Sequence, residues 1–137
     1  MSRISKREYY LGIAEAVAQR STCLRRQYGA VIVKDGEIIA RGYNKREAMG
    51  DATAHAEIVA IREACQRLGG WHLDGCEIYV TLEPCPMCAG ALAWSQIGEV
   101  VYGASDPKRG FSIFSPSLMH PKTKVTSGIL AQECGEM

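Results

Sequence analysis

The stretch CEIYVTLEPCPMC, residues 76–88, joins a strand pattern to the start of a helix. Its first seven residues are mostly apolar, β-branched or aromatic, which favours a strand over 76–82. Pro84 ends that strand because proline has no N–H to donate to a sheet. The residues from 85 to about 96 have the composition of a helix. A strand followed directly by a helix is the building unit of an α/β fold.

The sequence on both sides of this stretch alternates strand and helix patterns. Asp35-Gly36 supplies the positive φ angles of a tight hairpin turn, and Thr53 is a candidate cap for a second helix that ends at Gly69-Gly70. The expected elements are a helix over 7–20, strands over 30–34 and 37–41, a polar loop over 44–52, a helix from 53 to about 68, a strand over 99–103, a loop or short helix over 105–121, a possible strand over 124–126 and the start of a last helix over 128–132. This order predicts a mixed sheet with helices on both faces, in which helical crossovers make the later strands parallel.

Apolar side chains at helical spacing indicate which helix faces are buried. The residues expected to pack are Tyr10, Ile13, Ala14 and Val17 of the first helix, Ile58, Val59, Ile61 and Leu68 of the second, and Ala91, Leu92 and Trp94 of the third.

From length and composition we expect one domain, residues 1–137, in a soluble cytoplasmic protein. A chain of 137 residues suits a single hydrophobic core. The 47% hydrophobic and 23% charged content is ordinary for soluble proteins, and no apolar run approaches the ~20 residues of a membrane-spanning helix. The charged N-terminus leads into a helical pattern, unlike a secretory signal peptide. A net charge of +1 gives no general argument for nucleic-acid binding.

A metal site is predicted by His55 together with Cys85 and Cys88. The two cysteines are three residues apart at the start of a helix, so both sulfurs can point to one side, where the helix dipole favours thiolates. One histidine and two cysteines make three ligands, one fewer than a closed structural zinc site has. We therefore expect one Zn²⁺ per chain, with a bound water or hydroxide in the fourth position and a water pKa lowered toward ~7.

Glu57 completes the chemistry that this metal site implies. It follows His55 by two residues and is not needed as a ligand, so it is free to move protons in a hydrolytic deamination. His-x-Glu with a later Pro-Cys-x-x-Cys is the signature of zinc-dependent base deaminases. A zinc ribbon would need a second Cys/His pair at similar spacing, and a thioredoxin-like pair would not explain His55 and Glu57.

At these motifs the sequence resembles the cytidine and deoxycytidylate deaminase superfamily, and the resemblance extends over nearly the whole chain. The middle is most similar to tRNA adenosine deaminases, through DATAHAE at 51–57, YVTLEPC at 79–85, MCAGA at 87–91, SGIL at 127–130 and EC at 133–134. The N-terminal third is closer to deoxycytidylate deaminases, through CLRR at 23–26, GAVIV at 29–33 and GYN at 42–44. The resemblance implies a three-layer α/β/α sandwich with a mixed, mostly parallel sheet, a tightly bound zinc, and a homodimer or larger homo-oligomer.

The same resemblance implies further site residues. Asn44 is expected to hydrogen-bond the sugar or base, the backbone of Ala56 and the side chain of Glu57 to read the ring edge, and Asp106 to contact the flanks of the substrate. If the loops around Asn44 and Asp106 rim the pocket, four basic residues converge there and suit a phosphate-bearing substrate. These residues are Lys45, Arg46, Lys108 and Arg109.

Three functions remain open on the sequence. The first is deamination of adenosine to inosine in tRNA or a related nucleic acid, with the base splayed out over the zinc. The second is deamination of a small free substrate such as dCMP, cytosine, cytidine or guanine. The third is a catalytically silent zinc-binding subunit, against which Glu57 argues because such a subunit needs no proton shuttle.

Overall fold

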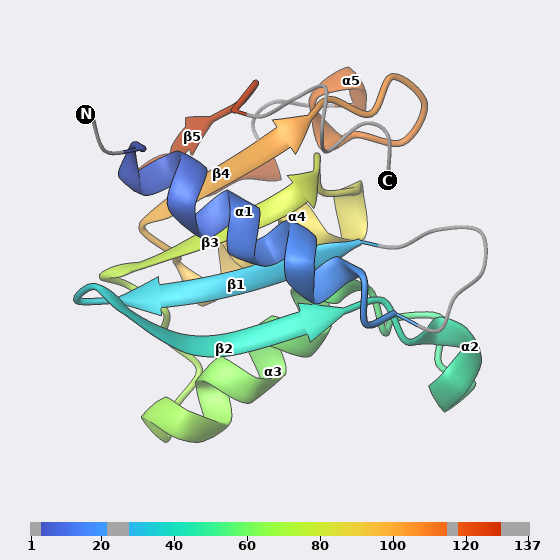
Figure 1. The fold of residues 1–137 in the computed structure, drawn as a ribbon, viewed down its shortest axis with the longest axis horizontal. Helices are drawn as coiled ribbons and strands as arrows, with labels where there is room; N and C mark the ends of the chain where they lie inside the picture. Colours follow the sequence, from blue (N-terminus) through green and yellow to red (C-terminus); the bar gives the residue numbers. More distant parts are fainter. Residues whose placement is uncertain (1–3, 22–27, 115–117, 130–137) are drawn as a thin grey trace.

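The described residues, 4–21, 28–114 and 118–129, form a five-stranded sheet with helices on both faces in the computed structural model (Figure 1). The elements are α1 (Lys6–Ala18), β1 (Gly29–Lys34), β2 (Glu37–Tyr43), α2 (Arg46–Met49), α3 (Ala56–Leu68), β3 (Cys76–Leu82), α4 (Pro86–Ser95), β4 (Glu99–Ala104), α5 (Phe111–Phe114) and β5 (Lys124–Thr126). In this part of the chain no helix is both long and apolar enough to span a bilayer.

Strand directions in the sheet bring two helix starts to one edge. The strand order is β2-β1-β3-β4-β5, and β1 pairs antiparallel with both of its neighbours, whereas β3, β4 and β5 pair in parallel. Four strands therefore share one direction and β1 alone runs against them, which confirms the mixed, mostly parallel sheet and the parallel later strands. Because β2 and β3 end at the same edge, α3 and α4 both begin there (Figure 1).

The sheet separates two layers of core. Alternate residues of β1 and β3 point to opposite faces, as the period of a strand requires. Val31, Val33 and Tyr79 pack with α1 on one face, whereas Ile32 and Ile78 pack with α3 and α4 on the other. The α/β/α sandwich is therefore confirmed, and the two-faced burial explains why these strands are apolar almost without interruption.

The hairpin and the short elements agree with the predicted pattern. Asp35 and Gly36 both have positive φ, 51° and 79°, as the predicted tight turn requires. The loop predicted over 44–52 contains the one-turn helix α2, and the stretch 105–121 contains the short helix α5. Strand β5 occupies 124–126 as predicted, whereas the helix predicted over 128–132 lies mostly outside the described residues.

The buried faces of two helices differ from the prediction. Helix α3 meets the sheet through Ala60 and Ala64, and not through its larger apolar residues, because it packs too close to β2 for large side chains. Only Ile61 of the predicted set packs against the core cluster; Ile58 and Val59 are half-buried and Leu68 is exposed. In α4, Leu92 is buried as predicted, but Trp94 is 82% exposed.

The start of α3 also differs from the prediction. Thr53 does not cap the helix, because its backbone N–H and its hydroxyl both donate to Asp51 Oδ1, at 2.9 and 2.7 Å. The N-cap is His55, whose side chain makes no capping hydrogen bond. Its imidazole is thereby left to the site described below.

We predict that Gly42→Ala in β2 destabilises the fold by about 1–3 kcal/mol. A Cβ at this position would lie 2.3 Å from the carbonyl oxygen of Ala56 and 2.7 Å from the nitrogen of Ala60, so α3 must move away from the sheet. The matched control is Gly12→Ala in α1, where a Cβ would have no heavy atom within 4 Å.

Urea denaturation checks this prediction. The control variant should be as stable as the wild type or more stable by up to about 1 kcal/mol, because alanine is the better helix former. Equal stability of the Gly42 variant and the wild type would contradict the close packing of α3 on β2.

Candidate functional site

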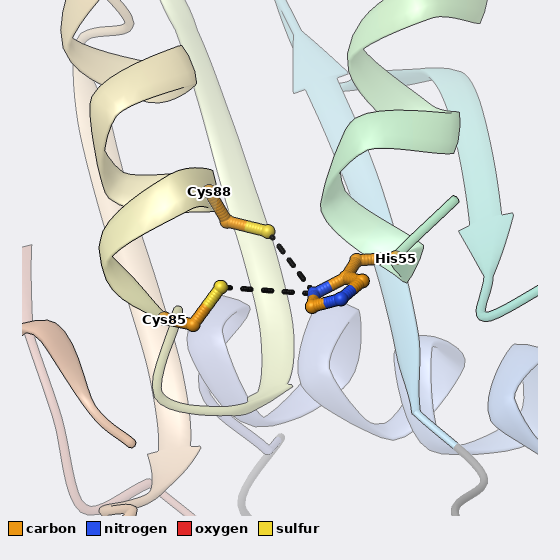
Figure 2. A group of neighbouring side chains, drawn as sticks. All are labelled: His55, Cys85 and Cys88. Carbon is orange, nitrogen blue, oxygen red and sulfur yellow. Dashed lines mark hydrogen bonds between the residues drawn. The ribbon is translucent and has the colours of Figure 1, made fainter. Parts of the chain in front are cut away.

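Two helix starts bring a histidine and two cysteines together. His55 is the N-cap of α3, Cys85 is the N-cap of α4, and Cys88 lies in the first turn of α4. The Nδ1 atom of His55 lies 3.7 Å from the sulfur of Cys85 and 3.6 Å from that of Cys88, and both thiols point toward the imidazole (Figure 2). All three ligand atoms lie within 4.8 Å of one another.

This donor set has the dimensions of a zinc site. Zinc binds sulfur at about 2.3 Å and imidazole nitrogen at about 2.0–2.1 Å, so a tetrahedral ion separates a nitrogen from a sulfur by about 3.5–3.7 Å. The N···S distances of 3.7 and 3.6 Å fall in that range. Among the described residues these three make up the one group of histidine, cysteine or acidic side chains that could hold a metal ion.

The three side chains differ in how readily they lose a proton. Hydrogen bonds from Cys88 and His55 lower the pKa of the Cys85 thiol to about 4, against the opposing effect of burial. The pKa of Cys88 is raised, first because its thiol donates to Cys85 and then because it is buried. The hydrogen bond with Cys85 also raises the pKa of His55. The cluster therefore shares its protons internally, and a divalent cation would replace them.

Glu57 brings a carboxyl group to the same site from the first turn of α3. Its side chain is buried, with 8% of its surface exposed, and burial raises its pKa to about 7. A hydrogen bond with Cys88 acts in the opposite direction. A carboxyl group with a pKa near neutrality can both take up and release a proton at working pH, which is what general acid–base chemistry needs.

A cavity opens beside these residues. Its lining includes His55, Glu57 and Cys85 from the helix starts, and Asn44 and Asp106 from the loops that follow β2 and β4. The apolar part of the wall comes from Tyr28, Val80 and Leu82. Cys88 and Ala56 are both buried, and neither lines the cavity. The cavity therefore offers a largely apolar slot with convergent polar groups, as small-molecule sites do.

Residues 4–104 match the family model described as the cytidine and deoxycytidylate deaminase zinc-binding region. The chain belongs to the cytidine and deoxycytidylate deaminase family. The matched range contains His55, Cys85 and Cys88 as well as Glu57, so the chain is a zinc-binding deaminase domain.

Known deaminases resemble the chain over most of its length. The tRNA-specific adenosine deaminase of Bacillus subtilis (strain 168) is 50% identical over 114 residues, which cover 80% of this chain and 71% of that protein. A structure from a study of A-to-I editing by tRNA:A34 deaminases at the wobble position has a TM-score of 0.84 at 41% identity, covering 93% of this chain and 97% of the other. The X-ray structure of guanine deaminase from Bacillus subtilis has a TM-score of 0.70 at 44% identity, covering 74% and 66%. The fold is therefore cytidine deaminase-like.

Asn44 and Asp106 of this deaminase domain also support the fold. Asn44 is 2% exposed, and its Oδ1 accepts a hydrogen bond of 2.9 Å from the backbone N–H of Tyr28. Asp106 Oδ1 accepts from the N–H groups of Lys108 and Arg109, both at 3.0 Å, in an Asx turn.

The four basic residues predicted at the pocket separate into two pairs. Arg46 and Arg109 line the cavity, whereas Lys45 and Lys108 do not. Lys45 instead places its ammonium 4.8 Å from the centre of the Tyr43 ring. The predicted convergence is thus confined to the two arginines.

The sequence reasoning gave no role to Glu83 or Thr81, both buried at the end of β3 and both lining the cavity. Thr81 Oγ1 accepts a hydrogen bond of 3.3 Å from the N–H of Gly29 and so ties β1 to β3 beside the cavity. An acidic residue directly after an apolar strand was the one available signal for Glu83, since a charge so placed needs partners.

Proposed function

We propose that this chain is a hydrolytic deaminase that converts adenosine to inosine in tRNA or a related RNA, releasing ammonia. The observation that carries the reaction is the buried carboxyl group of Glu57 beside a three-donor nitrogen–sulfur cluster at the wall of one cavity. The similarity to tRNA-specific adenosine deaminases supports the choice of substrate. A base in an RNA loop is splayed out and can enter such a cavity, whereas a paired base cannot.

His55, Cys85 and Cys88 are proposed to hold one zinc ion per chain. With three protein ligands, zinc supplies a water molecule of lowered pKa at its fourth position. Glu57 takes a proton from the attacking water and gives it to the N1 atom of adenine while the new C6–O bond forms. It then takes the remaining proton from the hydroxyl on C6 and gives it to the exocyclic nitrogen, so that the C6–N bond breaks, ammonia leaves and C6 becomes a carbonyl. One carboxyl group thus serves first as a base and then as an acid.

The remaining predicted contacts place the substrate. Asn44 is proposed to hydrogen-bond the sugar or base, and Asp106 to contact the flanking part of the substrate; their position on the cavity wall supports both roles. The backbone of Ala56, the first residue of α3, is proposed to read the ring edge, although Ala56 is buried and is not part of the cavity lining. Arg46 and Arg109 are proposed to bind backbone phosphates of the RNA, because both are permanently charged at the rim.

A free purine is the second candidate substrate. The similarity to guanine deaminase of Bacillus subtilis favours it over the other small substrates. Guanine carries no phosphate, so this candidate gives the two arginines no function. Product analysis with an adenosine-containing RNA hairpin, guanine, cytosine and dCMP separates the two candidates.

We further propose that residues 1–137 form one domain that assembles as a homodimer in the cytoplasm. Thiolate ligands suit a reducing compartment. Trp94 and Met87 are exposed on α4, and Trp71 is exposed nearby. The ring of Trp71 stacks on that of His72, with 3.6 Å between the ring centroids. An exposed group of large apolar side chains favours burial against a second copy.

Substitutions in the cluster test the chemistry. Glu57→Ala and Glu57→Gln should retain about one zinc per chain yet lose at least about 10²-fold in turnover, because the proton shuttle is gone. Cys85→Ala and Cys88→Ala should instead lose the metal and some stability. Zinc is measured by elemental analysis and turnover by ammonia release. Near-normal activity of the Glu57 variants would refute the proposed proton shuttle.

Charge reversal at the rim tests the substrate. Arg46→Glu and Arg109→Glu should each raise KM for an RNA hairpin by about tenfold and leave kcat nearly unchanged, because they bind phosphate and not the reacting base. Lys122→Glu, which lies outside this cavity, is the matched control and should leave KM unchanged. An unchanged KM in both arginine variants would remove the case for a phosphate-bearing substrate.

Light scattering tests the assembly. The wild type should be a dimer at micromolar concentration, and Trp94→Glu should shift it toward monomer because a charge cannot be buried there without a partner. The control is Ile4→Glu, which also changes an exposed apolar residue but lies ahead of α1, and this variant should remain a dimer. A monomeric wild type would contradict the proposed assembly.

A further inference from the structure

Glu83 is a buried carboxylate to which the proposed reaction gives no part. It directly follows β3, precedes Cys85 by two residues, and is 4% exposed. Within the described parts of the chain, no lysine, arginine or histidine nitrogen lies within salt-bridge distance of it. A buried carboxylate without a cation must be stabilised by hydrogen-bond donors.

Those donors come from the segment that follows β4. Glu83 Oε1 accepts from the N–H of Asp106 at 3.1 Å, and Oε2 accepts from the N–H and the hydroxyl of Ser112 at 2.9 and 2.5 Å. Backbone groups reinforce the contact, since the N–H of Phe111 donates to the carbonyl of Pro84 at 2.9 Å. One carboxylate thus holds both ends of the segment 106–112.

The segment also lies directly against this carboxylate. A Cβ at Gly110 would be 2.4 Å from Cδ and from Oε1 of Glu83. The same Cβ would lie 2.7 Å from the backbone carbonyl oxygen of Asp106, so a side chain at this position would displace the segment.

Between its two fixed ends the segment carries part of the cavity wall. Asp106 accepts from the N–H groups of Lys108 and Arg109 in the Asx turn, and Asp106 and Arg109 line the cavity. Although Glu83 lines the cavity too, its two oxygens already accept three hydrogen bonds from the segment.

We propose that Glu83 is a positioning residue that fixes the segment 106–112 and thereby places Arg109 and Asp106 for substrate recognition. It acts through these residues and not on the reacting atoms. Loss of the Glu83 contacts should therefore raise KM for the RNA and leave the rate of the chemical step nearly unchanged. This inference rests on the proposed function, but the holding of the segment is testable without any substrate.

Three variants test the proposal. Glu83→Gln replaces one acceptor oxygen by a donor, so at least one N–H of the segment loses its partner. Ser112→Ala removes a single hydroxyl from an exposed residue and leaves the carboxylate in place. Glu77→Gln is the matched control, because Glu77 lies near the start of β3, where it bonds Lys6 and the hydroxyl of Tyr79, and it does not line the cavity.

The rate of limited trypsin cleavage after Arg109 measures how firmly the segment 106–112 is held, and the measurement needs no substrate. Under native conditions Glu83→Gln should be cut about tenfold faster than the wild type, Ser112→Ala about threefold faster, and Glu77→Gln at the wild-type rate. Cleavage of both Glu83→Gln and Ser112→Ala within twofold of the wild-type rate would overturn the proposal.

Steady-state kinetics on an RNA hairpin with one adenosine in its loop then test recognition. Glu83→Gln with full zinc content should raise KM about tenfold and change kcat by less than about threefold, with a smaller KM increase in Ser112→Ala. A fall in kcat at unchanged KM would overturn the proposal. If Glu83→Gln fails to fold, Ser112→Ala provides the test instead. An unchanged KM of the Ser112→Ala variant would then overturn the proposal.

The two readouts separate the failure of this inference from that of the proposed function. A wild type that deaminates none of the candidate substrates, while Glu83→Gln is still cleaved faster, would overturn the deaminase proposal and support the holding of the segment. An active wild type with unaltered Glu83 and Ser112 variants would overturn only the role of Glu83.

Discussion

Two helices begin side by side at one edge of the sheet because β2 and β3 run in the same direction and each leads into a helix on the same face. The residues at these starts, His55 and Cys85, take the N-cap positions, and neither uses its side chain as a cap. The free N–H groups and the positive ends of two helix dipoles meet there, which favours thiolates and carboxylates. The donor cluster is therefore a direct product of the topology.

Close packing of α3 on the sheet fixes one half of this arrangement. Gly42 in β2 leaves room for the backbone of Ala56 and Ala60, and a side chain there would meet both. Small residues on the facing surfaces of α3 and β2 thus set the distance between the helix and the sheet. This distance also sets the position of His55 and Glu57. The other half, α4, is placed by Leu92 and Ala89 in the same core.

The segment after β4 completes the wall from the opposite side. Its position depends on polar contacts with Glu83 and on the burial of Phe111, which is 3% exposed and packs in the core beside Tyr102. Residues matched by the family model end at 104, so this segment lies beyond the matched zinc-binding region.

Local patterns in the sequence were enough to predict the strands, the hairpin at Asp35-Gly36, the parallel crossovers and the cluster of His55, Glu57, Cys85 and Cys88. They failed where tertiary contacts override local preference. The capping rule selected Thr53, but Asp51 binds it and His55 occupies the cap. Hydrophobicity selected Trp94 for the core, but the side of α4 that faces the sheet carries Ala89 and Leu92. The partners of Glu83 come from residues more than 20 positions away, at 106 and 112, and no local pattern encodes such a contact.

X-ray absorption at the zinc K edge tests the central claim most directly, because it reports the ligands themselves. On protein produced with zinc we predict one zinc per chain, bound by two sulfurs at about 2.3 Å and two lighter atoms at about 2.0–2.1 Å, one from His55 and one from solvent. A protein without stoichiometric zinc, or a shell of four protein ligands with no solvent position, would contradict the account.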